Sequence, residues 1–278
     1  MKPYLIYTFP WNYGSAGQIV LHNLAKALWD RYPNDTFTLT EDQEDLSIPN
    51  ISKCKIDRSE CIGVYPEVIG ENTFNCGTVV RYLLNLPGIW GPSFFPSTDI
   101  LFVYSKFFNS KMCLPEDRIL TTPCIDDELF INMGLKRSGR LFYRGKGLHG
   151  DGRPDHINLI DVPELGPMSQ FMEKEGQKKL VSTLNKCELL YSYDCVTAMN
   201  EISQLCGCPV VVFPNPRWSK KECSLLINWE AGGIGYGLEE TDYAMKTIDS
   251  EKLRKLHYLQ AINFQYQLYN FIKITQES

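Results

Sequence analysis

The sequence lacks a continuous run of about 18 apolar residues, the length at which a helix becomes a candidate to span a membrane. Its first ten residues, MKPYLIYTFP, turn polar too soon for a secretory signal peptide, so we expect a cytoplasmic protein whose first residues form a buried strand. Basic residues are also in deficit, because 28 Lys and Arg stand against 33 Asp and Glu for a formal net charge of -5. This balance disfavours a general nucleic-acid-binding protein, which would carry a basic surface.

Common motifs for metals and nucleotides are absent as well. Cys206 and Cys208 are separated by one residue, too few for a zinc knuckle, and no second cysteine pair lies nearby. The glycine-bearing loop after the first predicted strand, Gly14 to Gly17, does not have the G-x-G-x-x-G pattern that opens NAD-dependent oxidoreductases, and it is not a Walker loop because G-K-S/T is missing. A D-x-D metal motif is also missing from the chain. No nucleophile elbow or hydrolase triad is apparent. We therefore expect no metal and no organic cofactor, and an NAD-dependent oxidoreductase is disfavoured.

Cysteine, by contrast, is plentiful, with 10 residues. A chain without an export signal stays in a reducing compartment, where disulfides are rare. We expect these thiols to be reduced and to act mostly as small packing groups.

Short apolar runs alternate with amphipathic segments along the chain, the pattern of an α/β protein with parallel sheets. The first strand is predicted over residues 4–9 and the first helix over residues 18–29. A glycine-bearing loop joins them and contains Gly14, Ser15, Ala16 and Gly17, with Ser15 as a candidate N-cap. Such a loop lets a ligand come close to a helix N-terminus, although a tight strand-to-helix turn explains the glycines equally well.

The rest of the first half supplies candidates for acceptor binding or for lining a cleft. Further elements are predicted as strands over residues 36–40, 61–68, 100–104 and 120–124, a helix over residues 79–86 and a helical turn over residues 126–130. The three candidates are Glu67, Asn72 and Arg81. Arg81 lies inside the predicted helix and could instead pair with a nearby carboxylate. His22, in the first helix, is expected to be structural.

The second half starts with a strand over residues 141–143 and the basic segment Arg144-Gly145-Lys146-Gly147. Cations that follow a strand suit phosphate groups, because Arg offers a forked contact and Lys a point charge, although a solvated basic loop would look the same. Residues 156–161 are predicted as the next strand and residues 168–186 as a helix. His149 could also contact a phosphate.

Residues 184–214 form the most informative stretch. It contains a predicted strand over residues 188–191, a polar loop, a helix over residues 197–205, a turn at Gly207 and a strand over residues 209–213. A unit this compact predicts parallel strands. Asp194 and Thr197 then lie at the carboxyl end of a strand and at a helix N-terminus, a place that favours anions. Asp194 could also act simply as a cap.

The last third of the second half is expected to be mostly helical over residues 239–271, after a glycine-rich loop over residues 231–237. Its aromatic side chains, expected in the core or as a brace between the halves, are Tyr258, Phe264, Tyr266, Tyr269 and Phe271. We predict an N-terminal domain over residues 1–133, a C-terminal domain over residues 134–250 and a final helix over residues 251–278 that returns to the first domain.

Several of these features occur together in one known family. They are the two α/β halves, the glycine loop after the first strand, the basic pair, and the stretch Y-S-Y-D-C-V-T-A-M-N-E-I-S-Q-L-C-G-C-P-V-V-V. On these features the chain resembles GT-B glycosyltransferases of the retaining type, which use nucleotide-sugar donors, and is similar to enzymes of bacterial surface-polysaccharide synthesis. The segments G-E-N and V-V-R-Y-L-L-N-L-P-G add to the resemblance. It covers most of the chain, except residues 41–60 and 231–250.

The resemblance implies two Rossmann-like domains that face each other across a cleft. It implies an enzyme that moves a sugar from a nucleotide-sugar to a glycan or lipid-linked glycan, with retention and without a metal. No nucleic acid is an expected partner. A peripheral contact with the inner face of a membrane is compatible with a lipid-linked acceptor, although Lys273 is the only Lys or Arg beyond His257.

The resemblance also implies roles for individual residues. Arg144 and Lys146 would stabilise the departing diphosphate, and Glu201 would accept hydrogen bonds from the ribose hydroxyls; these three form the catalytic set. The donor-binding set would be Gly14, Ser15, Ala16, Gly17, Tyr193, Asp194 and Thr197. The acceptor or cleft set would be Glu67, Asn72 and Arg81.

One position departs from the family pattern. Such enzymes carry a helix glutamate five residues before the glycine of the C-G-C-P turn, where this chain has Ile202, and the glutamate here is Glu201. A shift by one residue turns a side chain by about 100° around a helix. The alternative hypothesis is therefore a catalytically inactive protein of the same fold that binds a nucleotide-sugar or a glycan.

Overall fold

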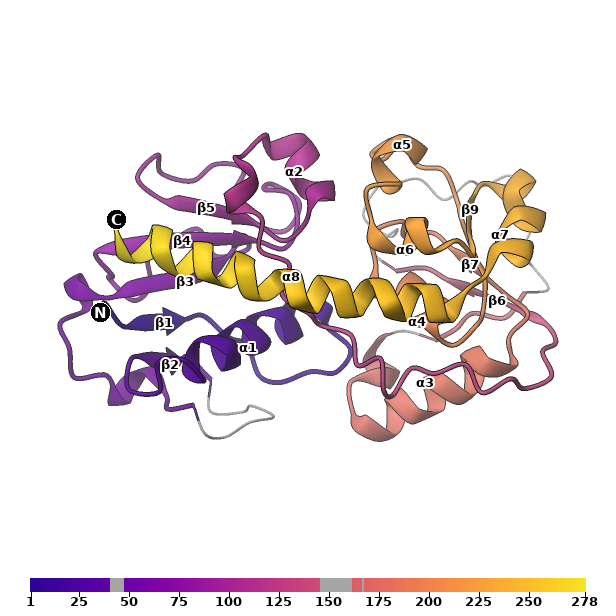
Figure 1. Ribbon diagram of the computed structural model, residues 1–278, viewed down its shortest axis with the longest axis horizontal. Coiled ribbons are helices and arrows are strands. Elements are labelled where there is room, and N and C mark those ends of the chain that lie inside the picture. The colour runs from indigo at the N-terminus through magenta and orange to yellow at the C-terminus, as the bar shows by residue number, and fades with distance from the viewer. Residues whose placement is uncertain (41–47, 146–161, 167) are drawn as a thin grey trace. The chain divides into compact units, whose positions relative to one another are not determined.

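The computed structural model describes residues 1–40, 48–145, 162–166 and 168–278. The chain divides into two compact units, each with its own parallel sheet (Figure 1). The first unit contains Met1–Asn12, Ala16–Cys124 and Gln260–Ser278, and the second contains Tyr13–Ser15 and Ile125–Leu259. The predicted α/β class with parallel sheets is confirmed. The sequence predicts a boundary after residue 133, whereas the structure divides the chain between Cys124 and Ile125.

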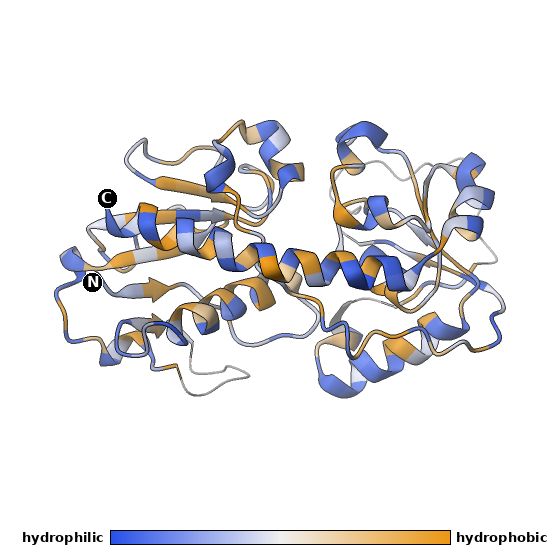
Figure 2. Cartoon of the chain, in the orientation of Figure 1, coloured by the Kyte–Doolittle hydropathy of each residue, from blue (hydrophilic) through white to orange (hydrophobic). Residues whose placement is uncertain are grey.

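The sheet of the first unit has the strand order β2-β1-β3-β4-β5, and each neighbouring pair is parallel. Its strands are β1 (Tyr4–Ile6), β2 (Thr36–Thr38), β3 (Ile62–Pro66), β4 (Thr78–Leu83) and β5 (Ile100–Val103). Its helices are α1 (Ala16–Trp29) and α2 (Lys106–Met112), with 3-10 turns η1 (Ile51–Lys53), η2 (Arg58–Glu60) and η3 (Glu116–Arg118). Hydrophobic residues concentrate on the strands, as Figure 2 shows.

The sheet of the second unit has the order β6-β7-β8-β9, again fully parallel. Its strands are β6 (Arg140–Tyr143), β7 (Leu189–Ser192), β8 (Val210–Val212) and β9 (Ile234–Tyr236). Its helices are α3 (Lys174–Lys186), α4 (Ala198–Leu205), α5 (Lys220–Cys223), α6 (Ile227–Ala231) and α7 (Thr241–Thr247), with 3-10 turns η4 (Met168–Phe171) and η5 (Leu238–Glu240). The last helix, α8 (Ser250–Gln276), begins in this unit and ends in the first.

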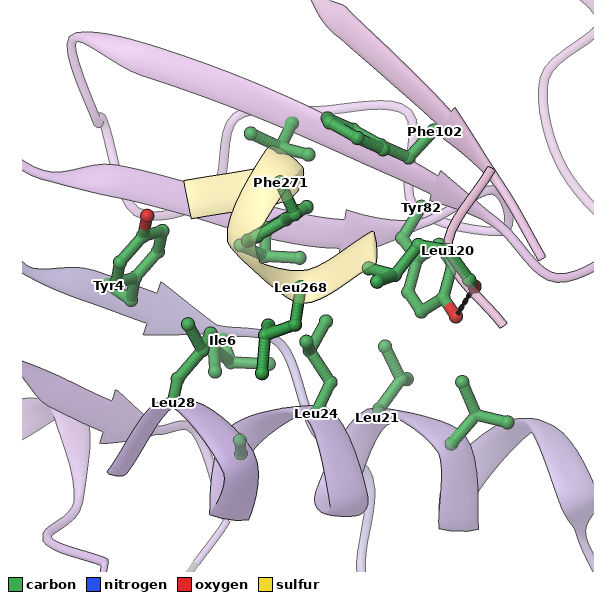
Figure 3. Close-up of a cluster of buried hydrophobic side chains, with 14 of the residues drawn as sticks. Tyr4, Ile6, Leu21, Leu24, Leu28, Tyr82, Phe102, Leu120, Leu268 and Phe271 are labelled. Atoms are coloured by element: carbon green, nitrogen blue, oxygen red, sulfur yellow. Dashed lines mark hydrogen bonds between the residues drawn. The ribbon is translucent and has the colours of Figure 1, made fainter. Parts of the chain in front are cut away.

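The core of the first unit is closed by residues from both ends of the chain (Figure 3). On α1, Leu21, Leu24 and Leu28 lie on one helical face, since three or four residues separate them, and all three are buried against the sheet. Leu268 and Phe271 of α8 enter the same cluster. Residues far apart in sequence therefore complete one core.

The prediction of a helix over residues 79–86 is wrong, because this segment forms β4. Val80 and Tyr82 point into the apolar cluster, and Arg81 between them belongs to the other face of the sheet. This alternation has a period of two, which is the period of a strand. The apolar run fits the period of a helix as well as that of a strand, and the β-branched Val79 and Val80 favour the strand.

Other differences concern short segments. Residues 120–124 form no strand; the nearest pairing is a single bridge between Val103 and Ile119. The predicted helical turn at residues 126–130 is confirmed as a single turn, because the Phe130 N–H donates to the Asp126 carbonyl at 3.1 Å, and Asp126 Oδ1 accepts the Glu128 N–H at 3.1 Å. The glycine-rich loop contains strand β9. The strand predicted over residues 156–161 lies outside the described residues.

Among the described residues, no helix is both long and apolar enough to cross a membrane. All 10 cysteines are free thiols, and seven of them are buried.

Candidate functional site

All four strands of the second sheet run in the same direction, so their carboxyl ends share one edge. This is the edge at which open α/β sheets bind ligands. The segment after β6 brings Arg144 to it, the segment after β7 brings Tyr193, Asp194 and Thr197, and the segment after β8 brings Asn215. The structure therefore gathers at one sheet edge Arg144 of the predicted catalytic set and three residues of the predicted donor-binding set.

Asp194 is held in place by bonds within its own loop. Its carboxylate Oδ1 accepts the Val196 N–H at 3.0 Å, and its carbonyl accepts the Ser192 hydroxyl at 2.9 Å and the Asn200 side-chain amide at 2.9 Å. The residue is 8% exposed. The predicted alternative of a local capping role is thus partly realised, because the carboxylate bonds a backbone N–H just before α4.

Gly145 makes the close approach between the loops after β6 and β7 possible. Its φ is +55°, and a Cβ atom added there would lie 2.4 Å from Cβ of Asp194. Only glycine combines this backbone conformation with such a contact. The glycine between the two predicted cations therefore serves to seat the Asp194 side chain against β6.

Tyr143, the last residue of β6, lies behind this contact and is 6% exposed. Burial raises the pKa of its phenol to about 12, and the Asp194 carboxylate adds to the increase, while a hydrogen bond with the Thr197 side chain opposes it. The hydroxyl thus stays neutral and belongs to the same polar cluster as Asp194 and Thr197.

Arg144 carries the cation at this edge and is partly exposed. Its Nε lies 2.8 Å from Glu164 Oε1, but the N–H is not directed at that oxygen, so the contact is a charge contact without a hydrogen bond. The guanidinium also lies over the ring of Phe142, at 5.5 Å from the ring centre. A phosphate could accept the N–H groups of this fork if it competes with Glu164.

Thr197 begins α4 as its N-cap. Its hydroxyl accepts the Met199 N–H at 3.3 Å. Tyr193 packs its ring between Phe142 and Phe213, with centroid distances of 6.1 and 4.7 Å. The N-terminal end of α4, with its positive dipole, therefore opens at the sheet edge beside these side chains.

Glu201 occupies the first turn of α4 and has a partner that the sequence did not indicate. Its Oε2 lies 3.1 Å from Nε2 of His257 in α8, and the two side chains are 20% and 10% exposed. Ile202, where the family pattern has glutamate, is buried with Met199 and Leu205 on the face of α4 that enters the protein interior. A carboxylate at position 202 would therefore be placed in the core, whereas position 201 faces α8.

Several predicted residues stand apart from this edge. Lys146 lies outside the described residues, as does His149. Gly14 and Ser15 belong to the short segment Tyr13–Ser15 of the second unit, while Ala16 and Gly17 form the first turn of α1 in the first unit.

The three acceptor or cleft candidates lie in the first unit, and each makes internal contacts. Glu67 Oε2 accepts the Leu84 N–H at 2.9 Å. Asn72 Oδ1 accepts the Tyr65 hydroxyl at 2.8 Å. Because β1 and β3 are neighbours on either side of the point where the strand order reverses, Glu67 at the end of β3 lies where such sheets bind ligands.

The side chain of Arg81 is buried in the first unit and bonds to residues of that unit. Its side chain is 1% exposed, and Nε donates to Asp99 Oδ2 at 2.7 Å in an ion pair. The remaining N–H groups donate to the carbonyls of Ile69, Gly70 and Glu71. The predicted alternative, pairing with a nearby carboxylate, describes these contacts.

Sequence reasoning missed four residues at or near the second sheet edge. They are Tyr143, Asn215, Arg217 and His257. Asn215 and Arg217 follow the strand V-V-V-F-P, as Asp194 follows its own strand, so the same rule applied to β8 finds them. Asn215 donates to Sγ of Cys195 at 3.2 Å, which ties the loops after β7 and β8 together. His257 has no signal in the sequence, because it lies 56 residues from Glu201.

Within the described residues, no group of three or more His, Cys, Asp or Glu side chains is arranged to hold a metal ion. The prediction that no metal takes part stays a prediction.

No known family model matches this chain, and no curated protein matches it. Among solved structures, it is similar to AviGT4, a glycosyltransferase involved in avilamycin A biosynthesis, with 12% identity, coverage of 98% of both chains and a TM-score of 0.45. It is also similar to an uncharacterized protein of Klebsiella pneumoniae, with 12% identity, coverage of 80% of this chain and 87% of that one, and a TM-score of 0.43. Both scores are below 0.5, so neither likeness bears on what this chain binds or does.

Proposed function

We propose that the chain is a glycosyltransferase whose second unit binds the nucleoside diphosphate of a nucleotide-sugar donor. The observation that carries the proposal is the gathering of Arg144, Asp194 and Thr197 at the carboxyl edge of a parallel sheet, at the N-terminus of α4. These residues combine a cation, a helix dipole and hydrogen-bonding oxygens at one place. They are also the residues that the resemblance to GT-B glycosyltransferases assigns to the donor.

In this proposal the sugar C1–O bond to the diphosphate breaks while the acceptor hydroxyl oxygen bonds to C1. The acceptor proton passes to a diphosphate oxygen, so charge and atoms balance. Arg144 stabilises the negative charge that grows on the diphosphate, assisted by the helix N-terminus. Retention, the absence of a metal, Lys146 as a second cation and an acceptor that is a glycan or lipid-linked glycan follow from the resemblance and remain predictions, as do the GT-B arrangement and the donor role of Gly14–Gly17.

Glu201 is proposed to accept a hydrogen bond from a ribose hydroxyl through Oε1. Its other oxygen, Oε2, faces His257 at 3.1 Å. Such a carboxylate has enough lone pairs for both partners.

The test is a thermal-shift and calorimetric panel of nucleoside diphosphates and nucleotide-sugars against the wild type. A ligand at about 100 times its Kd should stabilise the fold by about 2.7 kcal/mol. Arg144→Ala should weaken binding of that ligand by roughly tenfold or more, since charge-assisted hydrogen bonds contribute about 1.5–3 kcal/mol.

The matched control is Arg140→Ala. Arg140 lies on the same strand at its other end, where it donates to the Tyr191 hydroxyl at 2.9 Å. Its replacement should leave nucleotide affinity unchanged. The proposal fails if no nucleotide shifts the wild type, or if both arginine variants weaken binding alike.

A second candidate is a nucleotide-sugar or glycan binding protein without turnover. The observation that favours it is the displaced glutamate, because Ile202 is buried and Glu201 is paired with His257. A wild type that binds a nucleotide-sugar but neither transfers nor hydrolyses its sugar across a broad acceptor panel would select this reading.

A further inference from the structure

Helix α8 has two opposite apolar faces. The first is buried: Phe264, Leu268 and Phe271 are at most 5% exposed and complete the core of the first unit. The second is open to solvent, and its large side chains are Tyr258 (65% exposed), Leu259 (50%), Ile262 (53%), Tyr266 (66%) and Tyr269 (63%). The predicted core or bracing role therefore holds for the two phenylalanines but not for the three tyrosines, which lie on the other side of the helix.

The exposed side chains form a continuous stripe. At 100° per residue, all five fall within a sector of roughly 100°. Figure 1 shows α8 as one uninterrupted helix, and in Figure 2 hydrophobic residues recur along it between hydrophilic ones. Single exposed apolar residues need no explanation, but a row of this length marks an interaction surface.

Charged residues continue the stripe at both ends. Glu251 and Lys255 precede it and Lys273 follows it, all exposed and in the same angular sector. Seven positions then succeed one another at intervals of three or four residues, the spacing of a coiled-coil seam. They are Glu251, Lys255, Tyr258, Ile262, Tyr266, Tyr269 and Lys273.

The seven positions are placed symmetrically about Ile262, so two copies of the row that run in opposite directions match each other residue by residue. In an antiparallel pair of α8 helices with a two-fold axis at Ile262, Tyr258 faces Tyr266 of the partner subunit. Lys255 then faces Tyr269 of the partner subunit, which permits a cation–π contact. Glu251 faces Lys273 of the partner subunit, an opposite-charge pair. The same surface serves both copies, as a two-fold interface requires.

The area also suffices. Aromatic side chains bury about 150–250 Å² each when fully covered, so covering five large side chains that are half to two-thirds exposed would remove roughly 1,000 Å² in total from the two copies. This is the lower limit for a specific interface. An anionic membrane fits less well, because an acidic residue shares the face and the chain has a net charge of -5.

We propose that α8 pairs antiparallel with α8 of a second copy of this chain, about a two-fold axis at Ile262. The proposal does not depend on the proposed function. The assembled protein would have its two α8 helices in direct contact along the tyrosine-rich stripe.

The experiment is sedimentation velocity of the full chain from about 1 to 100 μM, with circular dichroism to check folding. The wild type should sediment as two chains at the upper end of this range. Ile262→Glu should raise the dimer Kd by roughly 100-fold or more, because it places two carboxylates together at the axis. Asn263→Glu, with the same charge one residue outside the stripe, should leave it within about twofold.

The register has its own test. Glu251→Lys and Lys273→Glu should each weaken the dimer by roughly three- to tenfold, and the double variant should restore it. A wild type that stays monomeric, or a double variant that is weaker than both single variants, overturns the proposal. Binding of the monomer to vesicles of anionic lipid that Ile262→Glu abolishes would also overturn it, in favour of a membrane surface.

Discussion

Gly145 illustrates how one residue shapes the candidate site. Its φ is left-handed, and a Cβ atom added to it would lie 2.4 Å from Cβ of Asp194. Glycine at this position therefore allows the loops after β6 and β7, which carry predicted site residues, to lie in contact. The basic segment was predicted for its two cations, and the glycine between them received no role. The sequence shows which residues are present, but the contact of Gly145 with a residue almost fifty positions later depends on the pairing of β6 with β7.

Gly145→Ala should destabilise the fold by about 2–4 kcal/mol, because it adds left-handed backbone strain to an overlap with Asp194. Gly139→Ala is the matched control, since Gly139 has φ +73° with no atom within 4 Å of its Cβ position. It should cost only the strain, about 1–2 kcal/mol. Urea denaturation measures both, and equal losses would show that the contact with Asp194 is unimportant.

The phenol of Tyr143 makes the stability of the fold depend on pH. The phenol of an unperturbed tyrosine has a pKa of about 10, and in the folded protein the pKa of Tyr143 is raised to about 12. The unfolded chain therefore loses this proton first, so the stabilising effect is full below pH ~10 and is lost as the pH rises toward about 12. Because other buried tyrosines behave similarly, the informative quantity is the difference from Tyr143→Phe.

Between pH ~10 and 12 the wild type should lose about 2–3 kcal/mol of stability more than Tyr143→Phe does. Unfolding in urea at several pH values measures this. Parallel stability curves for the two proteins would mean that the phenol titrates normally in the folded state.

Arg81 was predicted as a cleft residue, and its surroundings argue for a structural role. It is buried with Asp99 and bonds three carbonyls of the segment that follows β3. Arg81→Met should cost about 3–5 kcal/mol, because it leaves the Asp99 carboxylate buried without a partner. Arg81→Met combined with Asp99→Asn should recover part of that loss. A single variant of unchanged stability, measured by urea unfolding, would contradict this assignment.

At the scale of elements, periodicity predicted α1, α3 and α4 and the strands β1, β3, β5, β7 and β8, because each presents a clear apolar face or run. Periodicity failed at β4, because V-V-R-Y-L-L fits the period of a helix as well as that of a strand. The strand is recognised only from the structure, where Arg81 is buried on one face of the sheet and Val80 and Tyr82 on the other. Periodicity also failed to split α8 into two faces, since a phenylalanine and a tyrosine both count as aromatic, whereas only the phenylalanines are buried.

Helix α4 meets α8 through Glu201 and His257, and this contact can be measured. Glu201→Ala and His257→Ala should each cost about 1 kcal/mol, and the double variant should cost less than their sum by about 0.5–1 kcal/mol. Urea unfolding of the four proteins gives the coupling free energy. Strictly additive losses would mean that the 3.1 Å contact contributes nothing to the fold.

At the scale of the whole molecule, the parallel α/β class and the gathering of Arg144, Asp194 and Thr197 followed from the sequence. Both depend on strand direction, which follows from the order strand, helix, strand along the chain. The partner of Glu201 did not follow, because it lies in an element distant in sequence, whereas the pairing of Arg81 with a nearby carboxylate was among the predicted alternatives.

The thiols offer a test of the whole fold. Cys113 is exposed, Cys54 and Cys124 are partly exposed, and the other seven are buried. Iodoacetamide should therefore label Cys113 quickly in the native protein and all 10 cysteines in urea, as mass spectrometry of peptides can follow. Rapid native labelling of Cys195 or Cys208 would contradict the described packing.

The core of the first unit has a consequence for synthesis on the ribosome. Residues 1–124 emerge first, but Phe264, Leu268 and Phe271 belong to the same core and emerge last. The backbone of Lys2 is bonded to the Gln276 side chain, and the Tyr4 hydroxyl lies 2.8 Å from that of Thr275. The core of the first unit therefore cannot be completed until Phe264 to Phe271 have left the ribosome, after the whole of the second unit.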